Sequence, residues 1–344
     1  MVRNGTPVVD VHAHAIVEPA MALMAGQAEA QTAKRRELEI VGPASAHTQK
    51  EMIAKVAPLL TDVEQRLAAM DRAGVDIQLV SPSPAHYHDW PEPELATVHA
   101  RMIATGLAEL CATRPDRLLG LGLAPLQDPG VAEAVLVETM KDFGLRGVEI
   151  STNAPGRELG DPELEGFWAR AEELGAVVFI HPWGCTLAER LSGHYLYNIV
   201  GNPVETTVAL SHIIFSGLLD RHPDLKIIAA HGGGYLPMYP GRMDHAREVR
   251  PELDSPAGRP SDYLRRLYFD SLVHDPEQLS GLVDRVGADR ILLGSDFPFD
   301  MGVPDPVERV EAVPGLDEEE RCAICGGNAV SLLGISRTRP GRGQ

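Results

Sequence analysis

Eight short apolar segments recur along this 344-residue chain and alternate with longer amphipathic segments. Most of the short segments are continuous apolar runs, as expected for strands that are covered on both faces. A regular strand–helix alternation predicts parallel strands, and eight such units predict an α/β fold of the (β/α)8 TIM barrel type. A doubly wound open sheet is the alternative, but no glycine-rich phosphate-binding loop follows the first run. The predicted strands are Val8–His14, Ile77–Pro82, Leu118–Ala124, Gly147–Ser151, Val177–His181, Lys226–His231, Leu267–Leu272 and Ile291–Ser295.

The segments between these strands carry apolar residues at helical spacing. The predicted helices are Asp62–Ala73, Glu94–Thr113, Pro129–Phe143, Asp161–Leu174, Thr206–His222, Asp275–Val286 and Glu318–Leu333. We expect one barrel domain over residues 1–336 and a frayed tail over 337–344. The segment 15–61 is too long for a simple βα loop, so we expect it to form a lid over the C-terminal mouth of the barrel.

Charge and cysteine content restrict the class of protein. The net charge of −18 argues against a surface that binds nucleic acid. No apolar run reaches the length that spans a membrane, so the cytoplasm is the default location. The four cysteines, Cys111, Cys185, Cys322 and Cys325, are too few and too scattered for a disulfide framework. We therefore expect a protein of small-molecule chemistry.

The first predicted strand ends in His12-Ala13-His14. Alternate residues of a strand face the same side, so both imidazoles point together at the carboxyl end of the strand. Two convergent neutral imidazoles are the beginning of a metal site. For this pair taken alone, two solvated loop histidines are an equally good interpretation.

Further residues with metal-binding side chains stand at the ends of other predicted strands, which favours the metal interpretation. His181 ends the fifth strand, His231 ends the sixth, and Asp296 follows the eighth. Three imidazoles and one carboxylate form a suitable site for one divalent metal ion per chain, with a position left open for water or substrate. The mixed nitrogen and oxygen donors favour zinc, with manganese or iron as alternatives.

His231 fits the role of acid/base catalyst better than that of a further metal ligand. An imidazole with a pKa near neutrality can take a proton from water and return it to carbon or to a leaving group. Asp10 faces the same side as His12 and either orients a ligand or makes a hydrogen bond in the barrel floor. Gly232-Gly233-Gly234 either lets the backbone pass close to the site or simply makes a turn.

Several residues after the strands are candidates for the wall of a substrate pocket. His86 follows the second strand, Trp183 follows the fifth and Phe299 follows the eighth. Tyr195 lies in the insertion that comes after the fifth strand. A solvated loop position for His86, and a core position for Trp183 or Phe299, are the alternatives.

Four longer motifs stand out in the sequence, namely Val9–His14, Val178–Trp183, Ala230–Gly234 and Leu293–Phe299. Together they resemble the amidohydrolase superfamily, and specifically its aminocarboxymuconate semialdehyde decarboxylase branch. The similarity also covers Met70–Val75, Pro203–Thr207, Gly241-Arg242 and Leu272–Pro276, so it extends from the first strand almost to the C-terminal helix. Each motif is modestly specific, whereas their order and spacing together are highly specific.

The resemblance implies a metal-dependent barrel that removes carbon dioxide from an aromatic or muconate-type carboxylate without an organic cofactor. It implies that His12, His14, His181 and Asp296 bind the metal and that His231, with Asp296, forms the catalytic set. It also implies a homodimer in which Arg242 binds a substrate carboxylate from the neighbouring subunit. For Arg242, a surface salt bridge is the alternative.

Two departures from the branch affect substrate recognition. Where the branch has a second carboxylate-binding arginine in its first long loop, this chain has Ala57, with Lys55 nearby. Where the branch has a pocket tryptophan, this chain has Tyr195. A lysine is a point charge and does not replace the planar fork of an arginine. We therefore expect a related but different acid, such as a hydroxylated benzoate or a carboxymuconate analogue.

The same metal site also supports other chemistry. A hydrolase or hydratase that acts on a lactone, a cyclic amide or an unsaturated diacid would use the same ligands. The extent of the resemblance favours decarboxylation. A non-catalytic metal-binding protein fits less well, because a structural metal site is normally closed by four protein ligands away from a barrel mouth.

Overall fold

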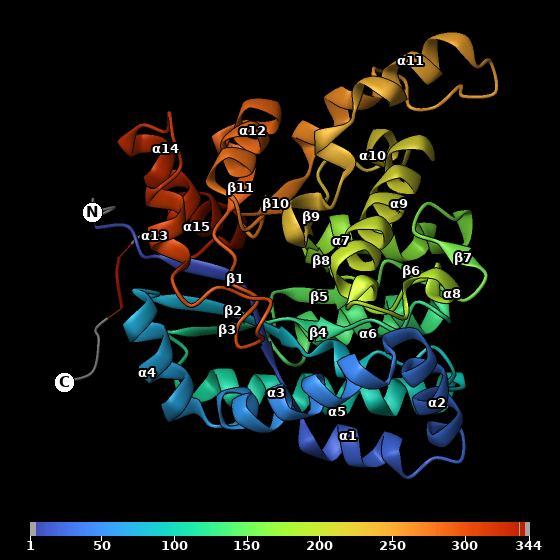
Figure 1. Cartoon of the computed structure of the whole chain (residues 1–344), viewed down its shortest axis with the longest axis vertical. Helices are drawn as coiled ribbons and strands as arrows, with labels where there is room; N and C mark the ends of the chain where they lie inside the picture. The colour runs from blue at the N-terminus through green and yellow to red at the C-terminus, as the bar shows by residue number, and fades with distance from the viewer. Residues whose placement is uncertain (1–4, 337, 341–344) are drawn as a thin grey trace.

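In the computed structural model, parallel strands form a ring with helices packed around it (Figure 1). The structure describes residues 5–336 and 338–340, so residues 337 and 341–344 of the predicted tail lie outside the described residues. The strands are β1 (Val9–Ala15), β2 (Ile77–Pro82), β3 (Leu118–Gly120), β4 (Gly122–Leu123), β5 (Gly147–Ile150), β6 (Asn153–Ala154), β7 (Arg157–Glu158), β8 (Val177–Ile180), β9 (Lys226–Ala229), β10 (Tyr268–Asp270) and β11 (Ile291–Leu292).

Backbone hydrogen bonds hold the ring together. The orders β1-β2-β3 and β11-β10-β9-β8-β5-β4 each consist of parallel neighbours, and only the short β6–β7 hairpin among the described strands is antiparallel. On one side the two groups are joined where Leu121 N donates to Val80 O at 2.9 Å. On the other side Val11 N donates to Leu293 O, and His14 N donates to Phe297 O, each at 2.8 Å. The predicted TIM barrel is thus confirmed.

Helices follow the strands as the alternating pattern predicts. Among the described residues no helix is long and apolar enough to cross a bilayer. The α-helices are α1 (Glu18–Ala25), α2 (Ala30–Val41), α3 (Pro43–Thr61), α4 (Val63–Ala73), α5 (Pro93–Thr113), α6 (Pro129–Lys141), α7 (Glu165–Leu174), α8 (Ala188–Leu191), α9 (Asn202–Phe215), α10 (Leu218–Arg221), α11 (Gly241–Val249), α12 (Pro276–Val286), α13 (Pro306–Glu311), α14 (Glu318–Cys322) and α15 (Asn328–Leu333).

Short helical turns lie between these elements. The 3-10 turns are η1 (Pro84–His86), η2 (Pro162–Leu164), η4 (His231–Gly233), η5 (Leu236–Met238), η6 (Pro260–Arg266) and η7 (Ala288–Arg290), and the π-helical turns are η3 (Tyr197–Gly201) and η8 (Ala323–Gly327).

Two predicted helices are interrupted at glycines. The helix expected over Thr206–His222 begins earlier, at Asn202, and ends before Gly217, which has a left-handed φ of 70°. The helix expected over Glu318–Leu333 is divided by η8. There Gly326 lies so close to the residues just before β1 that a Cβ would be 1.9 Å from Pro7 O. Only glycine allows these backbone positions without displacement.

Apolar side chains form two layers about the ring. The larger cluster lies between strands and helices and includes Val148, Trp168 and Ile213. A smaller cluster collects residues from strands on all sides of the ring, such as Val11, Phe179 and Ile228, and packs against α15. This smaller cluster fills the lower part of the barrel, so the polar residues at the strand ends are supported from below by a packed core.

The segment expected to form a lid contains α1, α2 and α3, drawn in blue along one side of the barrel (Figure 1). Helix α3 turns Gln49, Met52 and Ile53 toward a cavity at the barrel mouth. The insertion therefore supplies part of the wall of that cavity.

Candidate functional site

Four side chains from three strands meet at the carboxyl ends of the barrel strands. His12 and His14 lie in β1, His181 directly follows β8, and Asp296 follows β11. All four are buried, and each offers a ligand atom within 4.8 Å of the others. The three ring centroids lie 4.9 to 5.1 Å apart. The structure thus brings together the four residues that the sequence marks as metal ligands.

The atoms that face one another in this cluster lack hydrogen-bond partners. They are Nε2 of His12, Nε2 of His14, both ring nitrogens of His181 and Oδ1 of Asp296. Asp296 Oδ1 is 3.4 Å from His12 Nε2 and 3.2 Å from His14 Nε2. Donor atoms around a tetrahedral ion with bonds of about 2.1 Å lie about 3.4 Å apart. The residues present therefore fit one divalent metal ion.

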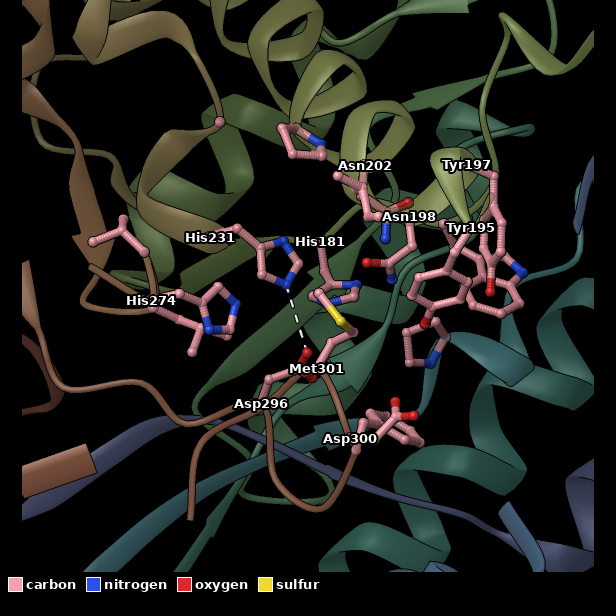
Figure 2. Close-up of a pocket in the computed structure, with 18 of the residues that line it drawn as sticks. His181, Tyr195, Tyr197, Asn198, Asn202, His231, His274, Asp296, Asp300 and Met301 are labelled. Atoms are coloured by element: carbon pink, nitrogen blue, oxygen red, sulfur yellow. Dashed lines mark ion pairs between the residues drawn. The ribbon is translucent and has the colours of Figure 1, made fainter. Parts of the chain in front are cut away.

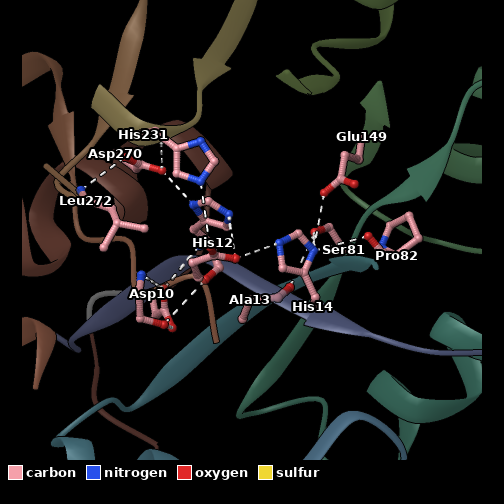
Figure 3. A network of polar contacts seen from close by, with 12 residues as sticks. Asp10, His12, Ala13, His14, Ser81, Pro82, Glu149, His231, Asp270 and Leu272 are labelled. Atoms are coloured by element: carbon pink, nitrogen blue, oxygen red, sulfur yellow. Dashed lines mark hydrogen bonds and ion pairs between the residues drawn. The ribbon is translucent and has the colours of Figure 1, made fainter. Parts of the chain in front are cut away.

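Hydrogen bonds behind the two β1 histidines fix their orientation (Figure 3). His12 Nδ1 donates to Asp270 Oδ2 at 2.6 Å. His14 Nδ1 lies 3.2 Å from Pro82 O, which can only accept, so this nitrogen carries the proton. In its neutral form each ring therefore carries its proton on Nδ1 and has a free lone pair on Nε2, the arrangement found for histidines that bind metals.

Asp10 holds the backbone of the site from beneath. Its Oδ1 accepts from His12 N and Ser295 N, each at 3.1 Å, and its Oδ2 accepts from Ser295 Oγ at 2.6 Å and from Gln78 Nε2 at 3.1 Å. From the sequence, Asp10 either orients a ligand or makes hydrogen bonds in the barrel floor, and these contacts are compatible with both roles. Asp10 is a hydrogen-bonding group of the barrel floor that also ties the His12 strand to the segment leading to Asp296.

The charges in the cluster favour a cation. Burial alone would lower the pKa of His12, but the charge of Asp296 and the hydrogen bond to Asp270 outweigh it and raise the pKa to about 10. Burial would raise the pKa of Asp296, but the charge of His12 and the nearby ring nitrogens of His12, His14 and His231 hold it well below the usual value. Burial and the neighbouring imidazoles lower the pKa of His181, which keeps that ring neutral. Neutral imidazole is the form that binds metals, so an ion bound here would displace the proton that this environment draws to His12.

His231 lies beside the cluster and faces the cavity (Figure 2). Its Nε2 is 3.7 Å from Asp296 Oδ2, and its ring centroid is 5.1 Å from that of His181. His231 and Asp296 have positive φ values of 54° and 56°. Backbone in this region is strained for residues other than glycine and often marks functional sites.

Close backbone packing around His231 depends on the glycines that follow it. A Cβ at Gly233 would lie 2.6 Å from the Phe269 ring, and one at Gly234 would lie 2.2 Å from Pro203 O. Both residues also have positive φ values, of 77° and 66°. The triple glycine therefore serves both functions considered for it, the turn and the close approach.

A cavity of about 480 Å³ opens above the cluster. Three of the residues predicted to bind substrate, Trp183, Tyr195 and Phe299, line it. His181, His231 and Asp296 reach it from below, and α3 closes one side. No lysine or arginine of the described residues lines this cavity.

The other two residues expected at the substrate lie outside this lining. His86 is fully buried in η1, where its Nε2 accepts from Val17 N at 3.1 Å. Arg242 is exposed on α11, which protrudes from the barrel at the upper right of Figure 1. Within one chain, therefore, neither side chain contributes to the cavity wall.

His86 belongs to a second group of histidines, with the buried His99 and the half-buried His88. The His99 ring lies 5.8 Å from that of His86 and 5.3 Å from that of His88. Burial, followed by the proximity of the other imidazoles, lowers the pKa of His86 to about 3 and that of His99 to about 4. All three rings are therefore neutral near pH 7.

This group predicts a loss of stability in acid. In the unfolded chain these histidines have a pKa near 6.5, which is above their pKa values in the folded protein. Their contribution to the free energy of unfolding is therefore complete above pH 6.5 and is lost as the pH falls. At pH 5 the expected loss is about 2 kcal/mol for His99. When the pH is lowered from 7 to 5, the free energy of unfolding measured in urea should decrease in both proteins. The decrease should be about 2 kcal/mol smaller in His99→Leu than in the wild type. The exposed His245→Leu is the control, and equal losses in all three proteins would contradict the prediction.

The structure adds functional residues that the sequence interpretation did not single out. Asp270 accepts from His12 Nδ1 and also from the backbone N–H groups of His231 and Gly232, both at 2.9 Å. Glu149 accepts from Tyr87 and lies 3.8 Å from His14 Nδ1. Asn202 lines the cavity with a buried, unpartnered oxygen. The only sequence signal for Asp270 is an acidic residue within an apolar strand.

Comparison with known protein families gives a match over nearly the whole chain. The model of a family described as amidohydrolase matches residues 9–335. A 2-amino-3-carboxymuconate-6-semialdehyde decarboxylase of Dictyostelium discoideum is 35% identical over 276 residues, which are 80% of this chain and 77% of that protein.

Solved structures of similar shape were also found. A 5-carboxyvanillate decarboxylase from Sphingomonas paucimobilis has a TM-score of 0.82 and 25% identity, covering 96% of this chain and 100% of that one. A dihydroxybenzoic acid decarboxylase from Polaromonas, solved with bound manganese and 2-nitroresorcinol as an inhibitor, has a TM-score of 0.81 and 24% identity. The match covers 96% of this chain and 97% of that protein.

Proposed function

The chain belongs to the amidohydrolase family, and from this premise we propose that it is a metal-dependent, non-oxidative decarboxylase of an aromatic or muconate-type carboxylic acid. One observation carries the proposal. Four unpartnered buried ligand atoms converge beside His231 at the base of a cavity large enough for a substituted benzoate. The decarboxylases that resemble this chain support the reaction type.

His12, His14, His181 and Asp296 would hold the metal ion. When bound, a divalent ion would supply Lewis-acid stabilisation for an oxygen of the substrate. The donor set of nitrogen and oxygen atoms suits zinc, and manganese is the alternative to be tested. Asp270 and Pro82 O keep the two β1 imidazoles in the required orientation.

His231 would manage the proton. In decarboxylation the bond between the ring carbon and the carboxylate breaks, carbon dioxide leaves, and the electron pair remains on the ring carbon. That carbon needs one proton to give the neutral product, and the His231 imidazolium would donate it and be reprotonated from solvent. The ring is held for this by the backbone hydrogen bonds to Asp270 and by the left-handed backbone at His231.

Carbon dioxide release tests the proposed reaction most directly. Protein loaded with zinc or with manganese should release carbon dioxide from members of a panel of hydroxybenzoates, carboxyvanillates and carboxymuconate semialdehydes. Metal-depleted protein should not. No release from any acid, together with hydrolysis of lactones or hydration of unsaturated diacids, would contradict the proposal in favour of the other chemistry that this scaffold supports.

We also propose a homodimer in which Arg242 reaches the cavity of the neighbouring subunit and binds a substrate carboxylate. Tyr235 and Met238 line the cavity and are each 44% exposed, and the adjacent Tyr239 is 70% exposed. An apolar surface that continues from the cavity mouth is suited to a second copy of the chain. An arginine supplied in this way would give the cavity the guanidinium fork that its own described lining lacks.

Mixed dimers test this arrangement. Arg242→Ala and His231→Asn should each be inactive alone, because each lacks one part of every site. After random exchange of subunits, half of the dimers are mixed and one of their two sites is complete, so about a quarter of the wild-type activity should return. Full activity of Arg242→Ala alone, or no recovery after exchange is verified by mass spectrometry, would contradict a shared site.

The four cysteines are free in the structure. Free thiols are maintained in reducing compartments, so we propose a cytoplasmic location.

A further inference from the structure

One wall of the cavity carries two side-chain amides close to the metal-binding cluster. Asn198 lies in η3 and Asn202 begins α9, and both line the cavity together with His181 and His231. Figure 2 shows both amides on the α9 side of His181, near Tyr195. A substrate held at His181 and His231 would therefore lie against this wall.

The Asn202 side chain is buried but incompletely paired. The residue is only 6% exposed, and its Oδ1 has no hydrogen-bond partner among the described residues. A buried polar oxygen without a partner destabilises the folded protein unless water or a ligand satisfies it. Because Asn202 borders the cavity, a bound ligand is placed to supply the missing hydrogen bond.

The local backbone holds this wall in place. In the π-helical turn η3, Asn202 N donates to Tyr197 O, and such turns are frequent at functional sites. Tyr197 in turn donates through its hydroxyl to Gln49 Oε1 of α3 at 3.2 Å. Glu205, one helical turn after Asn202, accepts from Thr186 N at 2.6 Å and from Asn153 Nδ2 at 3.0 Å. Both ends of the segment are thus fixed, so the amides are positioned before a ligand arrives.

We propose that Asn202, with Asn198 beside it, forms a subsite that recognises an uncharged hydrogen-bond donor on the substrate, namely a ring hydroxyl or amino group. Oδ1 is an acceptor and requires an O–H or N–H from the ligand. A second carboxylate at this position would bring only acceptor oxygens against Oδ1. This inference rests on the proposed decarboxylase function and assigns the recognition of such a substituent to the Asn202 side chain.

The size of the expected effect follows from the buried amide. A site built to hydrogen-bond a hydroxyl rejects an analogue that lacks it by as much as 10⁴–10⁵, because the polar group of the protein is then left unpaired. With Asn198 partly exposed and able to bind water, we expect a smaller discrimination here, of about 10²–10⁴ in kcat/KM. It should be largest for the ring position that faces Asn202.

The test compares pairs of acids that differ by one hydroxyl or amino group. The wild-type ratio of kcat/KM within the most discriminated pair should fall to within about tenfold in Asn202→Leu, which keeps the size of the side chain and removes its polar atoms. The acid without the donor should still be decarboxylated by this variant. Gln278→Leu removes an exposed amide at the other side of the cavity and should keep the wild-type ratio.

A binding measurement separates recognition from turnover. Calorimetric titration of the metal-loaded protein with 2-nitroresorcinol and 2-nitrophenol, which differ by one hydroxyl, should give at least a tenfold difference in Kd for the wild type. In Asn202→Leu that difference should disappear, while circular dichroism and metal content show an intact protein. An unchanged ratio in Asn202→Leu, in turnover and in binding alike, would overturn the subsite and leave the decarboxylase proposal standing. Absence of carbon dioxide release from every acid would instead reject the proposed function.

Discussion

Replacing His231 with asparagine is expected to lower kcat for carbon dioxide release by about 10²–10⁴-fold, the usual contribution of a positioned acid/base group. Asparagine keeps a polar side chain of similar reach but cannot donate a proton to carbon. The metal content should remain one ion per chain, because the four ligand atoms are supplied by other residues. The backbone at this position, with its φ of 54°, tolerates asparagine better than most residues.

The measurement is a single-turnover assay together with metal analysis by mass spectrometry. His212→Asn serves as the control, because this half-exposed histidine near the end of α9 is not among the residues that line the cavity. It should retain the wild-type rate. A His231→Asn protein with the wild-type rate would remove the proton-donor role, and one that loses its metal would assign His231 to the ligand set.

Replacing Asp270 with asparagine should have the broadest effect of any single substitution at the site. The buried carboxylate accepts from His12 Nδ1 and from three backbone N–H groups, those of His231, Gly232 and Leu272. Asparagine offers one acceptor oxygen, and its amide places N–H bonds against the remaining donors. We expect metal affinity to fall about 10–100-fold and the free energy of unfolding to fall by roughly 3 kcal/mol.

Metal-buffered titration and urea unfolding measure these two losses separately. Asp275→Asn is a matched control, since Asp275 lies a few residues further along the chain. Its carboxylate caps α12 by accepting from Glu277 N and Gln278 N, and it does not line the cavity. Its metal affinity should equal that of the wild type. Wild-type metal affinity in Asp270→Asn would show that His12 needs no carboxylate behind it.

The barrel was predictable because its strands are buried on both faces and are therefore apolar throughout. The predicted Ile77–Pro82 coincides with β2, and the other predicted strands overlap the observed ones. One of them, Leu118–Ala124, is divided at Leu121 into β3, which pairs with β2, and β4, which pairs with β5. Sequence periodicity does not show such a change of partner.

The metal-binding cluster was predictable because histidines at strand ends share one edge of a parallel barrel. Asp270 and Asn202 were missed for different reasons. Asp270 accepts from groups up to 258 residues away in the sequence, which no local pattern reveals. Asn202 lies in Gly201-Asn202-Pro203, which reads as a loop because glycine and proline usually end helices, whereas here Pro203 occupies the first turn of α9.

Anomalous diffraction from crystals of the protein loaded with manganese or zinc would locate the bound ion. We expect one strong anomalous peak per chain, enclosed by His12, His14, His181 and Asp296. A peak located elsewhere, for example among His86, His88 and His99, or no peak at the four residues in protein that releases carbon dioxide at its full rate, would contradict this expectation.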